Sequence, residues 1–204
     1  MANAIGVSLD RPGVAAARMI SDVLSPPAMA VPALVLGVWA SDAVGTYRYA
    51  VLYFLLAILM PLLYVVWLLK SGRIADFHLP NRRDRTGPFV VFLLCGLVAL
   101  GLLVYLGAPA SFVAPVIALL FQTLLLFLIT LTWQVSIHTA STAGLVTFAV
   151  LALGIGAAAL FVLVPLVGWA RIHLRRHTLA QTLAGALVGC SSFLLLFALR
   201  GLAW

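Results

Sequence analysis

The fold is decided by residues 141–169, which read STAGLVTFAVLALGIGAAALFVLVPLVGW. In so apolar a chain, one continuous helix over the 33 residue steps from His138 to Arg171 would extend ~50 Å, well beyond the ~30 Å hydrocarbon core of a bilayer. These two polar residues would then lie on opposite membrane faces. The two glycines of Gly154-Ile155-Gly156 instead suit a tight reversal between two helices of ~15 residues, a tolerable length inside a bundle. We therefore predict a break here, which returns Arg171 to the side of His138.

Composition places the whole chain in a membrane. Of its 204 residues, 65% are hydrophobic and only 8% are charged, with no glutamate, so no soluble globular surface can be built. The net charge of +7 does not indicate nucleic-acid binding, because the basic residues cluster in short connections between apolar runs. Cys95 and Cys190 lie within such runs and are expected to be small core residues, not a disulfide.

The apolar runs predict an all-α, polytopic transmembrane bundle of about six to seven spans in a single domain, residues 1–204. Residues 10–24 form an amphipathic segment, with Arg18 and Asp22 on its polar side, which indicates an N-terminal interfacial helix. The predicted spans cover residues 26–42, 51–69, 88–107 and 110–132, the two halves of residues 141–169, and residues 179–199. Gly185 and Gly189 in the last span are spaced for close helix contact.

Successive connections between the predicted spans lie on alternate faces of the membrane, and most of the basic residues fall on one of these faces. Of the twelve basic residues, all but Arg48 and Arg200 lie in the N-terminal segment or in residues 70–87, 133–140 and 170–178. The positive-inside rule places that face in the cytoplasm.

The chemistry-bearing residues belong to these same connections. Arginines offer fixed forks of donors that match phosphate oxygens, and two histidines supply a nucleophile and a proton donor, a set that suits phosphoryl transfer without a metal. No glutamate is present to make a zinc-protease motif of His173 and His177. His177 and Gln181 lie four residues apart on one helical face, so the amide oxygen can fix the imidazole tautomer. The candidate site comprises Arg82, Arg85, Ser136, His138, Arg171, His177 and Gln181.

Three motifs in these connections resemble those of the type 2 phosphatidic acid phosphatase superfamily of lipid phosphatases. That family's third motif, Ser-Arg-x5-His-x3-Asp, is similar to Ala170-Arg171-x5-His177-x3-Gln181, and its second, Pro-Ser-Gly-His, to Val135-Ser136-Ile137-His138. The first motif, Lys-x6-Arg-Pro, is the weakest match, to Asp76-x5-Arg82-x2-Arg85-x2-Pro88. The resemblance covers roughly residues 60–200 and is strongest to a divergent bacterial branch with the same Asp-x5-Arg-x2-Arg loop and terminal glutamine.

The resemblance implies a role for each matched residue. His177 would attack phosphorus to form a phosphohistidine and His138 would protonate the leaving alkoxide, with no cofactor or metal. Arg82, Arg85, Arg171, the Ser136 region and Asp76 would form the substrate-binding set. The implied partners are a phosphatidate-like or polyprenyl phosphate and the surrounding membrane lipids, in a bacterial inner membrane.

Gln181 is the main departure from the family pattern. Family members use an aspartate there to orient the nucleophilic histidine and stabilise its positive charge, whereas Gln181 can orient His177 but carries no charge. Ile137 also replaces a glycine that lets the backbone approach phosphate, and Asp22, Asp76 or Asp84 are the carboxylates that could compensate. An alternative therefore stays open: a weakened or inactive homologue that serves lipid binding, transport or assembly.

Overall fold

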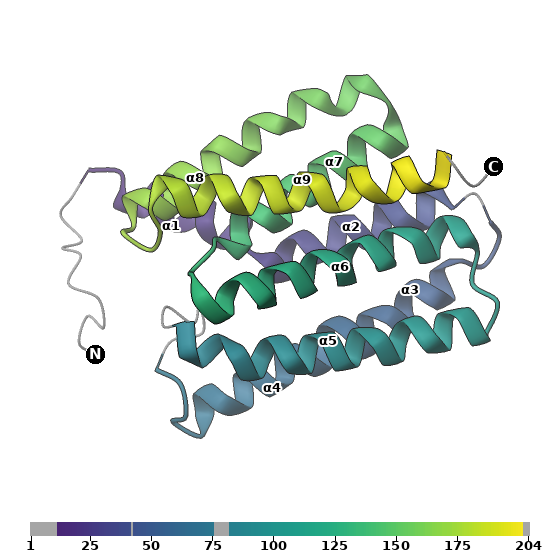
Figure 1. Ribbon diagram of the computed structural model, residues 1–204, viewed down its shortest axis with the longest axis horizontal. Coiled ribbons are helices and arrows are strands. Elements are labelled where there is room, and N and C mark those ends of the chain that lie inside the picture. The colour runs from purple at the N-terminus through teal and green to yellow at the C-terminus, as the bar shows by residue number, and fades with distance from the viewer. Residues whose placement is uncertain (1–11, 42, 76–81, 202–204) are drawn as a thin grey trace.

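The structure, a computed structural model, describes residues 12–41, 43–75 and 82–201, which form helices and no strand. The predicted all-α bundle is confirmed for these residues. Most of the helices run along the long axis of the molecule (Figure 1). They are α1 (Val14–Val23), α2 (Pro26–Ala40), α3 (Tyr47–Tyr53), the π-helical η1 (Phe54–Leu59), α4 (Met60–Lys70), α5 (Arg82–Tyr105), α6 (Ala110–Thr132), α7 (Ile137–Leu153), the 3-10 helix η2 (Ile155–Val162), α8 (Leu163–His173) and α9 (Leu179–Gly201).

Four helical stretches in the described residues are long and apolar enough to cross a bilayer. They are Tyr47–Lys70, Arg83–Tyr105, Ala110–Thr132 and Ile155–His173. A fifth is reached if α1 and α2, which meet at a bend of 41°, are counted as one broken span. The apolar helices Ile137–Leu153 and Leu179–Leu195 are shorter, so the structure supports four to five spans by length and composition, fewer than the six to seven predicted.

The predicted break in residues 141–169 is confirmed. Helix α7 ends at Leu153, and Gly154 takes a positive φ of 88°, a backbone conformation that favours glycine. The chain then reverses, and η2 and α8 return antiparallel to α7 (Figure 1). The reversal occurs because no side chain at residue 154 opposes this conformation, and it carries Arg171 back to the end of the bundle where α7 begins.

The first half of α9 packs closely on α7 through two glycines. A Cβ on Gly185 would lie 2.3 Å from the Ser136 carbonyl oxygen, and one on Gly189 would lie 2.3 Å from the Ala140 carbonyl oxygen. The predicted close contact at these positions is therefore confirmed. Because the two helices touch backbone to backbone, the start of α9 is fixed against the start of α7.

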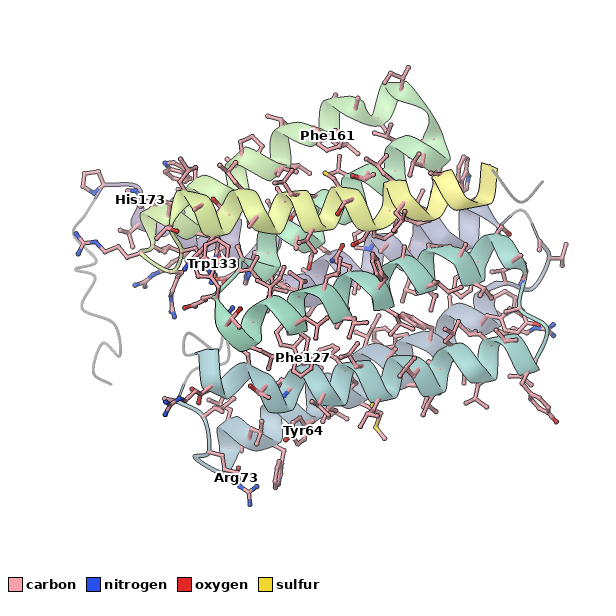
Figure 2. The ribbon with its side chains drawn as sticks, in the orientation of Figure 1. Tyr64, Arg73, Phe127, Trp133, Phe161 and His173 are labelled. Atoms are coloured by element: carbon pink, nitrogen blue, oxygen red, sulfur yellow. The ribbon has the colours of Figure 1, made fainter. Side chains whose placement is uncertain are left out.

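The polar connections gather at one end of the bundle, as the alternation of the spans predicts. Trp133, His173 and Arg73 all lie at this end in Figure 2. Helix α1 joins them, because Val14 and Ala17 are buried against Ala170 and Leu174 of the α8 segment. At the opposite end, the Tyr49 hydroxyl donates to the Leu106 carbonyl oxygen at 2.9 Å and accepts from Arg48.

Candidate active site

His177 lies in the tight reversal between α8 and α9. The backbone N–H groups of Arg176 and His177 both donate to the Arg171 carbonyl oxygen, at 2.9 and 3.3 Å. Arg175 takes a positive φ of 54° at the turn, an uncommon conformation for a residue with a side chain. These bonds fold the segment back on the end of α8, which brings His177 to Arg171 and leaves its side chain only 6% exposed.

Helix α9 begins with a capping box made by Thr178 and Gln181. The Gln181 backbone N–H donates to Thr178 Oγ1 at 3.3 Å, and the Thr178 backbone N–H donates to Gln181 Oε1 at 3.0 Å. These reciprocal bonds satisfy two of the N–H groups that a helix start leaves open. The side chain of Gln181 is thus held in place by the helix that it begins.

The oxygen of Gln181 also sets the state of the His177 ring. His177 Nδ1 lies 3.2 Å from Gln181 Oε1, and because an amide oxygen only accepts, Nδ1 carries the hydrogen and Nε2 keeps its lone pair. Burial, followed by the charges of Arg171 and Arg85, lowers the pKa of His177 from 6.5 to about 3, while the bond to Gln181 acts in the opposite direction. At neutral pH the ring is therefore neutral, the form in which Nε2 can act as a nucleophile.

Two arginines are buried at the same end of the bundle. Arg85, in the first turn of α5, is 3% exposed and donates from Nη1 to the Val135 carbonyl oxygen at 3.2 Å. Arg171, near the end of α8, is also 3% exposed and donates from Nη1 to Ser21 Oγ of α1 at 2.9 Å. Each guanidinium is thus positioned by a neighbouring segment.

His138 lies in the first turn of α7 and is 6% exposed. The residue before this turn, Ser136, is the cap of α7. It is fully buried, its Oγ accepts from the Thr139 backbone N–H at 3.4 Å as the cap of α7, and its own N–H donates to the Gln181 carbonyl oxygen. The cavity wall includes Ile137 and His138 but not Ser136, and the predicted phosphate contact of Ser136 stays a prediction.

The site opens into one large cavity. Its volume is about 620 Å³, and Asp22, Arg85, His138, Arg171 and His177 all line it, a size in the usual range for ligand pockets. The remaining wall is mainly apolar and comes from α2, η1, α4, α5, α6, α7 and α9. Along α6 the lining residues run from Leu126 to Phe112, a helix rise of ~20 Å. The cavity therefore joins a cationic end at the polar connections to a long apolar chamber inside the bundle.

The structure brings together four of the predicted site residues, namely Arg85, His138, Arg171 and His177. Gln181 contacts His177 as its spacing predicts. Asp76 and the side chain of Arg82 lie outside the described residues, so their predicted roles stay predictions.

Sequence reasoning missed two contributions to the site. The contact of Ser21 with Arg171 left no signal in the sequence, because it depends on how α1 packs on α8. The capping box was readable in the Thr178-x-x-Gln181 pattern. Asp22, one of the three carboxylates considered as compensation for Gln181, lines the cavity.

Arg176 and His173 differ in their relation to the site. Arg176, predicted to be a head-group anchor, is close enough for its charge to lower the pKa of His177 further. His173 stacks on Trp169 and lies 3.2 Å from the Pro12 carbonyl oxygen, which makes it a structural contact.

Across the described parts of the chain, no three His, Cys, Asp or Glu side chains are grouped as metal ligands. Comparison with protein-family models, curated proteins and solved structures finds no match to this chain.

The lowered pKa of His177 predicts a distinct response to acid. We expect its ring to remain neutral from pH 7 to pH 5, where an unperturbed imidazole with a pKa of 6.5 becomes mostly protonated. As the pH falls below 6.5, the unfolded chain binds this proton first, so the group's contribution to the free energy of unfolding is complete above 6.5 and declines toward pH 3. Nitrogen NMR of histidine-labelled protein in micelles, assigned with His177→Gln, measures the midpoint. A titration midpoint near 6.5 would contradict the prediction.

Proposed function

We propose that this protein is a membrane-embedded phosphatase or phosphotransferase that acts on lipid phosphates through a phosphohistidine at His177. One observation carries the proposal: two histidines and two arginines from three separate segments line the same cavity, and that cavity continues as an apolar chamber. The resemblance of these segments to the type 2 phosphatidic acid phosphatase motifs supports the same chemistry, and membership of that superfamily is part of the proposal.

The cavity favours an amphiphilic substrate. Arg85 and Arg171 at one end suit a phosphate dianion, since guanidinium groups pair with phosphate oxygens through charge-assisted bonds. The apolar wall beyond them suits a hydrocarbon chain, each buried methylene of which contributes about 0.8 kcal/mol. A soluble phosphate ester would leave this chamber without a complementary group, so the proposed substrate is a lipid phosphate.

The proposed reaction has two balanced steps. In the first, the Nε2 lone pair of His177 forms a bond to phosphorus while the bond from phosphorus to the lipid oxygen breaks, and protonated His138 gives its proton to that oxygen. In the second, water attacks phosphorus, its proton passes to His138, and the P–N bond breaks to release inorganic phosphate. Arg85 and Arg171 stabilise the charge on the phosphate oxygens in both steps. Transfer to an alcohol in place of water would make the protein a phosphotransferase.

The membrane arrangement that fits this proposal has more crossings than the four to five that helix length and composition alone support. Helices α7 and α9, although short, pack on one another through Gly185 and Gly189, and such buried short helices can cross within a bundle. With them the chain has six to seven spans, and α1 lies in the interface beside α8. By the positive-inside rule, the basic residues at the polar end favour a cytoplasmic site, and the bacterial inner membrane is part of the proposal.

A second candidate function is lipid-phosphate binding without turnover, in transport or assembly. Gln181 favours it, because its side chain is engaged in capping α9 and adds no negative charge beside His177. In that case the cavity would hold the phosphate but the phosphohistidine would not form at a useful rate.

Phosphate release by purified protein distinguishes the two functions. Phosphatidate, lysophosphatidate and a polyprenyl phosphate would be presented in mixed micelles to the wild type and to His138→Ala. We expect release by the wild type from at least one lipid and a decrease of about 10²–10⁴-fold in the variant, the usual contribution of a general acid. Equal release by both proteins, or binding of the lipids with no release at all, would refute the enzymatic proposal.

A further inference from the structure

A polar amide without a partner lies within the apolar chamber of the cavity. Gln122, in the middle of α6, lines the cavity and is only 2% exposed. Its Oε1 accepts no hydrogen bond from any described residue. Leaving such a group unsatisfied costs about 1–3 kcal/mol, and a methionine of similar length would avoid that cost. An amide at this position is therefore not explained by packing within the protein alone.

The surroundings of Gln122 indicate which part of the amide faces a ligand. A Cβ added to Gly144 of α7 would lie 2.5 Å from Gln122 Oε1 and 3.0 Å from the Phe193 ring. The oxygen is thus enclosed between α7 and Phe193 of α9, and the amide nitrogen is the part left to face the cavity. Since this nitrogen only donates, its partner in a ligand is a hydrogen-bond acceptor.

The depth of Gln122 below the phosphate site limits where that acceptor lies. Gly144, which faces the amide, follows His138 by six residues in the same helix, a rise of ~9 Å. In an acylated glycerol phosphate, the ester carbonyl oxygens lie only a few bonds from phosphorus, at the start of the hydrocarbon chains. The long side chains of Gln122 and Arg85 reduce the distance that the lipid has to span between the phosphate site and the amide. A polyprenyl chain offers no acceptor at any depth.

We propose that Gln122 donates a hydrogen bond to an ester carbonyl of the bound lipid, so that the cavity selects acyl-ester lipid phosphates over polyprenyl phosphates. This inference rests on the proposed function, because it takes the phosphate to lie among Arg85, His138, Arg171 and His177. It names the substrate class of that site and assigns Gln122 as the residue that recognises it.

A matched pair of ligands tests this assignment. Phosphonate analogues of phosphatidate, one with ester-linked and one with ether-linked chains of equal length, would be titrated against the wild type, Gln122→Met and Thr123→Val, and the dissociation constants measured by tryptophan fluorescence. Wild type should bind the ester analogue roughly fivefold more tightly, the usual worth of one hydrogen bond, and Gln122→Met should bind both analogues equally. Thr123 also lines the cavity, but its hydroxyl donates to the Leu119 carbonyl oxygen of its own helix at 2.7 Å, so Thr123→Val should keep the ester preference.

The outcomes separate this inference from the proposed function. Equal affinity of the wild type for the two analogues, or an unchanged preference in Gln122→Met, would overturn the inference even if phosphate release is observed. A Gln122-dependent preference in a protein that releases no phosphate would support the inference and refute turnover. Gln122→Met should unfold at or above the wild-type temperature, because it removes an unpaired buried group, and Gln122→Leu provides a second apolar replacement for the same comparison.

Discussion

Replacing His177 with alanine should reduce phosphate release from lipid phosphates on the order of 10⁴-fold, because the proposed covalent intermediate could no longer form. The wild-type imidazole ring has the tautomer and the charge state that the proposed nucleophilic attack requires. Its Nδ1 hydrogen is directed to Gln181, and burial with the nearby arginines holds its pKa near 3, so that Nε2 keeps its lone pair at neutral pH. The initial rate of inorganic phosphate release in mixed micelles measures the effect.

The proposed phosphohistidine should itself be detectable. Wild-type protein mixed with a radiolabelled lipid phosphate and quenched in alkali should carry phosphate on His177, and brief acid treatment should remove it. His173→Ala is the matched control, because His173 stacks on Trp169 and contacts the Pro12 carbonyl and does not line the cavity. Phosphate release retained in His177→Ala, or label found on another residue, would refute the phosphohistidine mechanism.

Gly189→Ala should lower the stability of the protein by about 1–3 kcal/mol, the usual cost of overpacking a close contact. The added Cβ would lie 2.3 Å from the Ala140 carbonyl oxygen and 2.8 Å from the Gly144 nitrogen. Both are backbone atoms, so the contact is relieved only if α7 and α9 move apart. The thermal unfolding temperature in detergent measures this effect, and activity should fall with it because α9 carries Gln181 and α7 carries His138.

Gly101→Ala provides the control for this prediction. Gly101 lies within α5, and a Cβ there meets no atom within 4 Å. The change should therefore be neutral or stabilising by up to about 1 kcal/mol, since alanine favours helix more than glycine does. If Gly189→Ala unfolds at the same temperature as Gly101→Ala, the close contact between α7 and α9 is wrong.

Features set by local spacing were accurately predicted from the sequence. The glycines at residues 154–156 predicted the reversal because a positive φ is open to glycine at little cost. The contact of His177 with Gln181 followed from their four-residue separation at a helix start. The number of spans was less well predicted, because α7 and the apolar part of α9 are shorter than an independent crossing requires and their placement depends on neighbouring helices.

Features set by packing between distant segments were not predicted. The hydroxyl of Ser21 in α1 accepts a hydrogen bond from Arg171, a contact that depends on how α1 packs on α8. Gln122 lies in an apolar run like any other, and its amide becomes notable only once Gly144 and Phe193 enclose its oxygen. No local pattern distinguishes these side chains, since their neighbours come from other helices.

The amino-acid sequence by itself determined that this chain is a membrane helix bundle and that its basic and histidine-bearing connections meet at one end. The reason is that a bilayer leaves an apolar chain few ways to satisfy its backbone hydrogen bonds, and each crossing alternates the side of the next connection. The tertiary structure alone decided which side chains face the shared cavity. That choice depends on the distance of closest approach between helices, which at α7 and α9 is fixed by two glycines, and on the rotation that each helix takes against its neighbours.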